Sequence, residues 1–440
     1  WYRIDRLYRK FIHHSRQSAQ ASLMSELSER IENLYVNNFL LKLNDSFQSH
    51  IDKLDRWAAP SVTRQRDFFA RHVAPFRAKD QKICVIISDA LRYEIAEELL
   101  GRIRSIDRYD AEIEPMLSMV PSYTQLGMAA LLPNKELRIA ADETGTVLVD
   151  DQSSQGLKDH DIVYTYHNQI DAIGDKPPTE EKVFDAAEDA LEDLTTLVKK
   201  LTSANASNLL ITADHGFLFQ NRAIEESDFL GSKAAGEKIL YRDRRFILGQ
   251  GLTTDDGFRK FTSEEAGLEG DVEILLPKSI NRLRLKGSGS RFVHGGATLQ
   301  EVVVPVLKVN KKRQSDVVAV EVDIVGSPNK SITSGQIAVL FYQSRPVTEK
   351  VQPRLLRAGI YSQSGTLISD RHDLVFDLRS DNPRDREMQV RFLLAKAADE
   401  FNGQEVILKL EEQHSGTSHF KEYQSIRYLL KRSFGNDFDF

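Results

Sequence analysis

The spacing of apolar and polar positions changes along the chain and marks three stretches. From residue 1 to about residue 78, apolar residues recur every three or four positions, as in LSERIENLYVNNFLLKLNDSF (residues 27–47), and glycine is absent. This spacing places the apolar side chains on one face of a helix. We therefore expect a helical lead-in segment over residues 1–78, whose exposed aromatic residues Tyr35 and Phe39 offer a surface to a partner protein.

In the second stretch, residues 79–313, short apolar runs alternate with longer amphipathic patterns. The pattern EEKVFDAAEDALEDLTTLVKKL (residues 180–201) has helical spacing. Alternating strands and helices are typical of βα units, so this stretch predicts an α/β core with a mainly parallel sheet. The strand-like runs are KICVIIS (82–88), NLLITA (208–213) and EVVVPVLKV (301–309).

In the third stretch, residues 314–440, apolar residues alternate with polar ones. Turn-forming segments separate the runs VVAVEVDIV, QIAVLFYQ and DLVFDL. Period-two runs between turns predict a β-sandwich, here an Ig-like domain of about 125 residues. The last run, KEYQSIRYLLKRSF, is compatible with a strand or a helix.

The composition excludes some classes of protein. The formal net charge of −6 offers no overall basic field. Nucleic-acid binding would depend on local patches such as Arg242, Arg244 and Arg245, and such patches are more commonly solvated surface. The longest apolar runs fall short of the ~18 residues that a membrane span needs, and the N-terminal residues carry too many charges for a signal peptide. We expect no membrane association.

The single cysteine, Cys84, lies inside a strand-like apolar run. One cysteine excludes an internal disulfide and is typical of a reducing compartment. We therefore expect a buried, unreactive thiol in a cytoplasmic protein. Because the chain begins with Trp1 rather than methionine, we also expect it to be part of a longer protein.

Acidic and histidine residues lie beside the strand-like runs of the middle stretch. Asp89 follows the first run, Asp214 and His215 follow the second, and His294 precedes the third. Strand ends of an open α/β sheet converge on one crevice, so these residues can meet although Asp89 and Asp214 are far apart in sequence. Carboxylates and imidazoles bind divalent metals. The pattern predicts a metal site.

Each of these residues also has a simpler explanation. Asp89 stands where a strand gives way to a helical pattern, a common place for a helix cap. Asp214 and His215 precede a glycine, as residues of a tight turn do. His294 is compatible with an ordinary loop histidine, whose two following glycines let other groups approach closely. The metal hypothesis depends on the combination.

Four motifs occur in order along the middle stretch: VIISDALRYEIAEEL (85–99), MVPSYTQLGMAALLP (119–133), ITADHGF (211–217) and FVHGGATLQEVVVPVL (292–307). Together they resemble the PglZ domain, a branch of the alkaline phosphatase superfamily. The resemblance covers roughly residues 80–310 and implies an alkaline-phosphatase-like hydrolase core over residues 79–313.

The resemblance also implies two divalent metal ions that flank a hydroxyl nucleophile. In this chain it places one metal at Asp89, Asp214 and His215, beside the nucleophile and metal ligand Thr124. It places the other metal at Asp171 and His294.

The nucleophile and a phosphate-binding arginine have alternatives. Thr124 precedes a helical pattern, where free N–H groups can bind a phosphoryl group, and its simpler role is a helix cap. Ser122 is the alternative nucleophile. Arg92 is either a phosphate clamp or a partner of Glu94 or Glu97 in a surface salt bridge.

One position departs from the superfamily pattern of Asp followed four residues later by His. Here Asp171 is followed by Asp175, which we expect as a further metal ligand. A carboxylate makes the site richer in oxygen and shifts its preference towards manganese or magnesium, although zinc stays the first expectation. His167 is an alternative nitrogen ligand or a hydrogen-bonding histidine, and His160 is a weaker candidate.

These inferences predict a metal-dependent phosphodiesterase or phosphatase that works through a phosphothreonine at Thr124. The resemblance implies bacterial phage defence of the BREX type, with a DNA methyltransferase among the protein partners and a nucleic acid or oligonucleotide as substrate. The alternative is a metal-stabilised scaffold or assembly component of the defence complex, with little or no catalytic activity.

Overall fold

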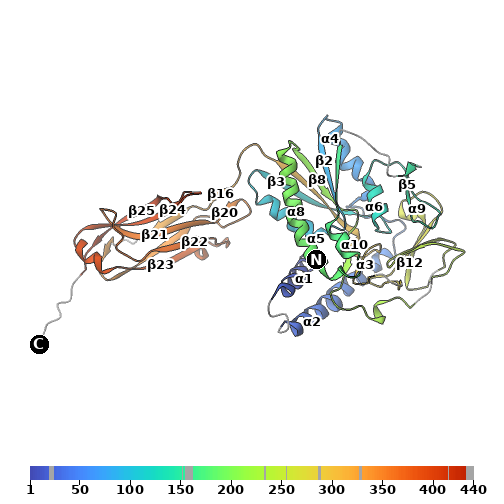
Figure 1. Ribbon diagram of the computed structural model, residues 1–440, viewed down its shortest axis with the longest axis horizontal. Helices are drawn as coiled ribbons and strands as arrows, with labels where there is room; N and C mark the ends of the chain where they lie inside the picture. The colour runs from blue at the N-terminus through green and yellow to red at the C-terminus, as the bar shows by residue number, and fades with distance from the viewer. Residues whose placement is uncertain are drawn as a thin grey trace. The chain divides into compact units, whose positions relative to one another are not determined.

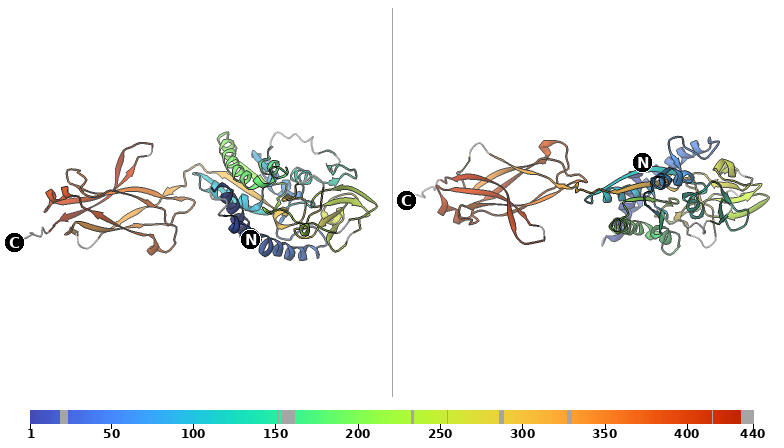
Figure 2. Two further views of the ribbon diagram at one scale, coloured as in Figure 1. Left: turned by 60° about the horizontal axis from the view of Figure 1, so that its bottom comes forward. Right: turned by 90° about the horizontal axis from the view of Figure 1, so that it is seen from above.

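The computed structural model divides the chain into two compact units, drawn in Figures 1 and 2. The first unit comprises residues 1–103 and 109–312, so the helical residues 1–78 belong to the same unit as the α/β core. The second unit comprises residues 104–108 and 313–440. The described residues are 1–18, 24–150, 152–153, 162–231, 234–253, 255–285, 289–326, 330–414 and 416–432.

Six strands form the central sheet of the first unit, in the order β1-β3-β15-β8-β2-β7. Strand β15 runs antiparallel to both neighbours, whereas the other three pairings are parallel. The α/β sheet is therefore parallel in most of its pairings and mixed at β15. The strands are β1 (Thr63–Arg64), β2 (Ile83–Ser88), β3 (Tyr109–Leu117), β7 (Ile162–His167), β8 (Asn208–Thr212) and β15 (Val303–Lys311).

Strand β2 shows why this sheet has helices around it. All six of its residues are buried, and Cys84 is 4% exposed, which confirms the expected buried thiol. A strand that is buried on both faces needs cover on both sides and shows no polar alternation. The connecting helices are α5 (Tyr93–Arg104) after β2, and α7 (Gln169–Gly174) and α8 (Val183–Ser203) between β7 and β8.

The N-terminal residues are helical as expected, but Tyr35 is not exposed. Its ring stacks on Tyr8 with 3.7 Å between centroids, its hydroxyl donates to Asp5 at 2.5 Å, and the residue is 4% exposed. Phe39 is half-buried. The expected aromatic partner surface is therefore wrong at Tyr35, because this ring packs inside the unit. The elements here are α1 (Tyr2–Gln17), α2 (Ser25–Asn33), the π-helix η1 (Leu34–Leu40), α3 (Leu41–Ile51) and α4 (Ala74–Arg77).

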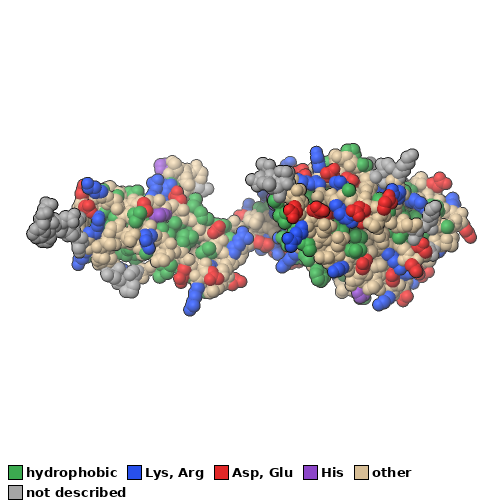
Figure 3. All heavy atoms as spheres, turned by 90° about the horizontal axis from the view of Figure 1, so that it is seen from below, with side chains coloured by type: hydrophobic (Ala, Val, Ile, Leu, Met, Phe, Trp, Pro, Cys, Tyr) green, Lys and Arg blue, Asp and Glu red, His purple; other side chains and the backbone are tan. Residues whose placement is uncertain are grey.

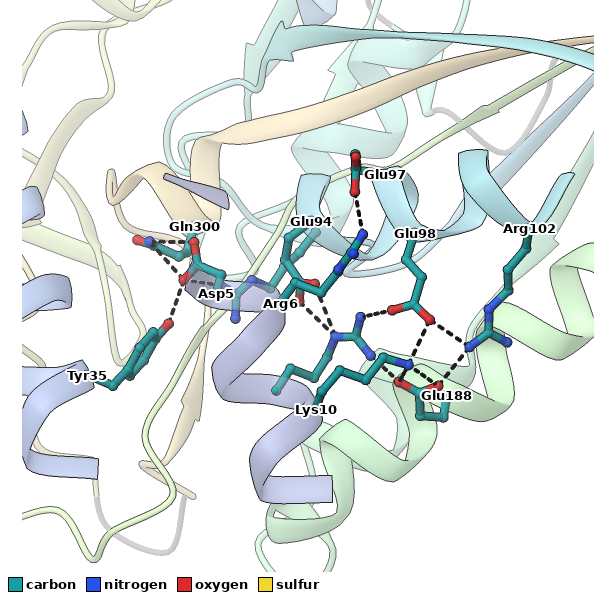
Figure 4. A network of polar contacts seen from close by, with 12 residues as sticks. Asp5, Arg6, Lys10, Tyr35, Glu94, Glu97, Glu98, Arg102, Glu188 and Gln300 are labelled. Atoms are coloured by element: carbon teal, nitrogen blue, oxygen red, sulfur yellow. Dashed lines mark hydrogen bonds and ion pairs between the residues drawn. The ribbon is translucent and has the colours of Figure 1, made fainter. Parts of the chain in front are cut away.

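Ion pairs join α1 to the helices of the core (Figure 4). The guanidinium of Arg9, which is fully buried, donates to Glu94 at 3.0 and 3.1 Å, to Glu98 at 2.6 Å and to Glu188. Lys10 lies 2.7 Å from both Glu98 and Glu188. Each acid thus has a cationic partner. We call Arg9, Lys10, Glu94, Glu98, Arg102 and Glu188 the α1 charge network.

Smaller sheets complete the first unit, and the expected βα alternation did not include them. Strands β10-β11-β13-β12 form an antiparallel sheet, β4, β5 and β6 form another, and β9 pairs with β14. Residues from the first two of these sheets share a core with α6 (Thr124–Leu131). The strands are β4 (Leu137–Ile139), β5 (Val147–Val149), β6 (Gln152–Ser153), β9 (Leu218–Phe219), β10 (Lys238–Arg242), β11 (Ile247–Gln250), β12 (Phe258–Phe261), β13 (Glu273–Pro277) and β14 (Phe292–Val293).

The second unit is built of sheets, as the period-two pattern predicts. A three-stranded sheet, β17-β19-β23, and a five-stranded sheet, β18-β25-β24-β21-β22, bury their inward-facing residues in one shared core. The last run, which was open between strand and helix, forms strand β25. The strands are β17 (Val322–Val325), β18 (Ser331–Ile332), β19 (Gln336–Gln343), β21 (Arg354–Ser362), β22 (His372–Phe376), β23 (Glu387–Leu393), β24 (Glu405–Gln413) and β25 (Phe420–Leu430).

Charge is mixed on the face of the molecule that Figure 3 draws. On the face drawn in Figure 3, acidic and basic side chains are interspersed among the described residues of each unit. None of the described helices combines the length and the apolar character that crossing a bilayer requires.

Candidate metal centre

Asp89 and Asp214 occupy the same edge of the central sheet. Strands β2 and β8 pair in parallel, and each of these residues lies just beyond the C-terminal end of its strand. Asp214 Oδ1 accepts the backbone N–H groups of Ala90, at 3.2 Å, and His215, at 2.9 Å. These bonds fix the Asp214 carboxylate while its other oxygen stays free of them. Asp89 is 1% exposed and Asp214 is fully buried.

His215 faces both carboxylates. Its Nε2 lies 3.4 Å from Asp89 Oδ1 and 3.5 Å from Asp214 Oδ2. Its Nδ1 lies 2.9 Å from the carbonyl oxygen of Gly216, which accepts the Nδ1 proton and aims Nε2 at the acids. A second hydrogen bond of this kind is how proteins orient metal-binding histidines. Asp89, Asp214 and His215 place their ligand atoms within 4.8 Å of one another.

His294 reaches the same place through the pairing of β14 with β9. Val293 pairs with Leu218, and the His294 ring stacks on the His215 ring with centroids 4.1 Å apart. Asp171, near the start of α7, lies 3.9 Å from His294 Nε2. Asp171, His215 and His294 form a second group whose ligand atoms lie within 4.8 Å of one another.

The glycines after His294 permit close approach, as expected. A Cβ on Gly295 would lie 2.5 Å from the Phe246 ring, and a Cβ on Gly296 would lie 2.3 Å from Arg245 Nη2. Gly295 also has a φ of +105°, a backbone conformation that favours glycine. His294 is 8% exposed and packed against these groups, unlike an ordinary loop histidine.

Thr124 is the first residue of α6, and its hydroxyl lies beside the acids. Thr124 Oγ1 is 3.1 Å from His215 Nε2, and the residue is half-buried. The residue at the cap position is Tyr123, so the Thr124 hydroxyl is not the helix cap. Gly127 lets α6 approach, because a Cβ there would lie 2.3 Å from the Asp214 carbonyl oxygen.

Several buried polar atoms in the two ligand groups lack a hydrogen bond to the described residues. The five residues of these groups are Asp89, Asp171, Asp214, His215 and His294. Among the described residues, none makes a hydrogen bond to Asp89 Oδ1, Asp171 Oδ1, Asp214 Oδ2 or His294 Nδ1. Buried polar atoms are almost always hydrogen-bonded, and those that are not need an explanation. A set of carboxylate oxygens and imidazole nitrogens around a common point fits divalent metal ions.

The pKa values show the same excess of negative charge. Burial, and next the neighbouring carboxylate of Asp214, raises the pKa of Asp89 to about 7. Burial, and next Asp89, raises the pKa of Asp171 to about 7. Burial lowers the pKa of His215, but the carboxylates of Asp214, Asp89 and Asp171 outweigh it and raise that pKa to about 9. The protein's own groups therefore do not balance these acids.

Two other candidates, Asp175 and His167, have partners elsewhere. The carboxylate of Asp175 pairs with Arg244, and its side chain is 49% exposed. His167 Nδ1 lies 3.0 Å from the Ser88 hydroxyl. Neither residue joins the two groups of ligands. His160 lies outside the described residues.

The alternative nucleophile and the candidate clamp also have structural partners. The Ser122 hydroxyl donates to the Gly296 carbonyl oxygen at 2.7 Å and accepts the Gly295 N–H at 3.2 Å. Arg92 is buried and lies 2.8 Å from Asp5, so its salt bridge joins α1 to the segment just before α5, and not to Glu94 or Glu97. Both residues hold the site's surroundings together.

Several residues that shape the site were missed in the sequence. Tyr166 on β7 donates its hydroxyl to Asp89 Oδ2. Gln65 is fully buried and donates to the carbonyl oxygens of Ala213 and Asp214 at 3.0 and 2.7 Å. The alternating pattern of IVYTYH marks β7 as a strand, but only its register against β2 brings Tyr166 to Asp89.

The basic patch at Arg244 and Arg245 is not solvated surface. Arg245 is fully buried and pairs with the fully buried Glu301, with Nε–Oε1 and Nη2–Oε2 distances of 3.0 and 2.8 Å. Arg244 is 6% exposed. The surface expectation was wrong for these two residues because both side chains turn inward beside the His294 loop.

Comparisons with known proteins agree with the motifs. The chain matches the family described as BREX system PglZ alkaline phosphatase-like domain over residues 68–161 and 155–309. It is 33% identical to the alkaline phosphatase-like protein BrxZ of Escherichia coli O9:H4 (strain HS), over 99% of this chain and 55% of the relative. It is 31% identical to the alkaline phosphatase-like protein PglZ of Bacillus cereus (strain H3081.97), over 100% of this chain and 56% of the relative. The chain thus spans about half the length of these relatives.

Solved structures of murine and human ectonucleotide pyrophosphatase / phosphodiesterase 5 are more distant. Each match covers 52% of this chain and 88% of the other, with a TM-score of 0.34 and with 12% and 10% sequence identity, respectively. The family assignment rests on the sequence matches, which span the central sheet and the five clustered side chains. The chain belongs to the PglZ family of alkaline phosphatase-like proteins associated with the BREX system.

Proposed function

We propose that this chain is the hydrolytic part of a metal-dependent phosphoric-ester hydrolase that prefers phosphodiesters. One observation carries the proposal. The half-buried hydroxyl of Thr124 lies 3.1 Å from His215 Nε2, and His215 belongs to both groups of clustered ligand atoms. A metal site with a purely structural role has no need of a free hydroxyl beside its ligands.

Asp89, Asp214 and His215 would hold one divalent metal, and Asp171 and His294 would hold the other. Zinc is the first choice for these oxygen and nitrogen ligands, followed by manganese and magnesium. Asp175 stays outside the proposed set, because its carboxylate pairs with Arg244. Bound metals would supply positive charge for the phosphoryl oxygens and would favour the ionised hydroxyl of Thr124.

Thr124 then acts as the nucleophile. Its Oγ1 forms a bond to phosphorus, the bond from phosphorus to the leaving alcohol breaks, and the alcohol oxygen takes up one proton in place of the one that the Thr124 hydroxyl gives up. Water attacks the resulting phosphothreonine, which releases a phosphomonoester and restores the threonine. The first turn of α6 supports the step, since its backbone N–H groups lie beside the nucleophile.

The biological setting is part of the proposal. The family description names the BREX system, which supports a role for this chain in that system. The resemblance of the motifs leads us to propose phage defence, with protein partners that include a DNA methyltransferase. A nucleic acid or oligonucleotide is the proposed substrate. The one cysteine, buried and free, agrees with a reducing, cytoplasmic location.

The test is hydrolysis of bis-p-nitrophenyl phosphate and p-nitrophenyl phosphate by metal-stripped protein that is then given zinc, manganese or magnesium. We expect diester turnover with at least one metal, and a loss of about 10³-fold or more in Thr124→Ala. Thr124→Ser is the matched control, because it keeps a hydroxyl at the same place and should retain measurable turnover.

Two outcomes would oppose the proposal. Full turnover in Thr124→Ala would exclude Thr124 as the nucleophile. Stoichiometric metal binding without turnover of either ester would favour the alternative, a metal-stabilised assembly component.

A further inference from the structure

One pocket of the first unit is lined by arginines. It has a volume of about 200 Å³ and lies between the β10–β11 turn and the segment that leads into β14. Its walls include Arg244, Arg282, Arg284, Phe229, Gly289 and Val293. Val293 precedes His294, but the pocket includes none of the five clustered ligand residues. It therefore adjoins the metal centre without sharing its ligands, and the charge of Arg244 acts on both Asp171 and His294.

Arg282 is the unusual member of this pocket. Its side chain is fully buried, and Nη1 donates to the carbonyl oxygen of Ile280 at 3.2 Å. Its Nε and Nη2 atoms make no hydrogen bond to any of the described residues. A guanidinium carries five N–H donors and keeps its charge in proteins, so most of this group's capacity is unused.

Neighbouring acids are already paired with other arginines. Glu301 holds Arg245 through two bonds, at 3.0 and 2.8 Å. Asp228 lies 2.8 Å from Arg222. These two acids are the ones whose charge acts on Arg282, and neither forms an ion pair with it among the described residues.

The other two arginines of the pocket have exposed partners. Arg244 pairs with the half-exposed Asp175 and lies 3.4 Å from Asp243. Arg284 pairs with the exposed Glu226. Exposed ion pairs are weak, so an anion can compete for these guanidinium groups. Arg282 has no such partner to give up.

The buried positive charge of Arg282 is unfavourable for folding when no counter-ion is near. Burial, and next the charge of Arg245, lowers the pKa of Arg282 to about 9. A buried charge that lacks a partner destabilises a fold strongly. The fold tolerates this arrangement if an anion from outside the described residues neutralises it.

We propose that the pocket at Arg244, Arg282 and Arg284 binds a phosphate group. Guanidinium groups match the oxygens of phosphate through paired N–H···O bonds, and three of them line one small cavity. The group belongs either to free phosphate and small phosphorylated molecules or to the backbone of a nucleic acid. The proposal does not rest on hydrolysis at the metal centre.

The experiment is a calorimetric titration of the metal-stripped protein with inorganic phosphate. Removing metals keeps phosphate from binding at the metal centre. We expect Arg282→Met to bind phosphate at least about tenfold more weakly than the unmodified protein. Arg56→Met is the matched control, because Arg56 is exposed and pairs with Glu264 away from the pocket, and it should bind as the unmodified protein does.

A stability measurement accompanies the titration. Without phosphate, Arg282→Met should melt at the same temperature as the unmodified protein or higher, since an unpaired buried charge is gone. With phosphate, only proteins that keep Arg282 should gain melting temperature. If Arg282→Met does not fold, Arg284→Gln serves instead, because Arg284 is largely exposed, and we expect about threefold weaker binding.

A competition experiment distinguishes the two sources of phosphate. If a single-stranded oligonucleotide without terminal phosphates displaces inorganic phosphate, the pocket takes backbone phosphates. If it does not, the pocket takes free or terminal phosphates. No phosphate binding by the unmodified protein, or equal binding by Arg282→Met and Arg56→Met, would overturn the proposal. Neither result depends on turnover, so the hydrolase proposal succeeds or fails separately.

Discussion

The first unit buries two clusters of acids and treats them in opposite ways. In the α1 charge network, Glu94, Glu98 and Glu188 all contact Arg9, and Lys10 and Arg102 add further positive charge (Figure 4). In the candidate metal centre, Asp89, Asp171 and Asp214 face two histidines and keep oxygens that bond to none of the described residues. The acids of the α1 charge network have cationic partners in the protein, whereas the acids of the candidate metal centre lack enough positive charge.

The pKa of Glu98 shows this difference, although burial raises the pKa of Glu94 in the same network. The pKa of Glu98 falls to about 2, because hydrogen bonds from Lys10, Arg102 and Arg9 outweigh the effect of burial. The pKa values of Asp89 and Asp171 rise to about 7, because burial and neighbouring acids act without an equal positive charge. Burial alone therefore does not set the state of a carboxylate, and the supply of cations decides it. The shortage of positive charge around Asp89, Asp171 and Asp214 is the physical argument for bound metal ions at the strand ends.

Removing the central cation of the α1 charge network should have the largest effect on stability. Arg9→Met leaves the acids of the α1 charge network without their shared partner, so we expect a loss of about 3–5 kcal/mol in the free energy of unfolding. Urea denaturation measures it. Arg6→Met is the control, because the Arg6 side chain is 42% exposed and pairs with Glu97, and it should cost less than about 1 kcal/mol. Equal losses in both variants would show that burial of the network contributes nothing.

Neutralising one acid in each cluster should change stability in opposite directions. Asp214→Asn in metal-stripped protein keeps an oxygen to accept from Ala90 and His215 and removes a repelled charge. We expect a gain of about 1 kcal/mol. Glu98→Gln loses charge-assisted bonds to Arg9, Lys10 and Arg102, and we expect a loss of about 1–2 kcal/mol.

Bound metal should reverse the stability gain expected for Asp214→Asn. In the presence of a binding metal, Asp214→Asn should be less stable than the unmodified protein, because it loses a ligand. Thermal melting of both variants with and without metal makes the comparison. A loss of stability in metal-stripped Asp214→Asn would mean that Asp214 already has a sufficient partner in the protein.

The sequence predicted those parts of the site that follow local patterns. Asp89, Asp214 and His215 come directly after apolar runs that form β2 and β8, and parallel pairing then brings them together. The two glycines after His294 indicated the close packing of that loop, and the structure confirms it. These signals are short-range, so a single sequence contains them.

The remaining parts depend on contacts between distant segments. Arg92 lies just before the helix that carries its candidate partners, but the fold pairs it with Asp5 on α1. The sequence predicts Arg245 on a solvated surface, and only the packing around it shows that it is buried. The burial of Arg282 likewise depends on packing between distant segments. A buried arginine has no local sequence pattern, because its partner can come from any part of the chain.

The dependence of stability on pH should differ between the clusters, and this is the smallest effect. Asp89 and Asp171 have folded pKa values of about 7, above the ~4 of an unfolded chain. Metal-stripped protein should therefore lose stability as pH rises from about 4 to 7, because the folded state binds more protons in that range. Glu98 has a folded pKa of about 2, below the unfolded value, so its contribution is lost as pH falls from about 4.5 to 2.

Urea midpoints of metal-stripped protein should therefore be highest near pH 4.5–5, with slopes of at most about 1.4 kcal/mol per pH unit for each proton. Burial lowers the pKa of His294 and offsets part of the slope on the neutral side. Glu98→Gln should flatten only the acid side, and Asp214→Asn only the neutral side. Bound metal should remove the loss between pH 5 and 7, because it keeps the carboxylates ionised. A midpoint that falls steadily from pH 7 to 5 in the stripped protein would show that the acids at the strand ends are as well paired as those of the α1 charge network.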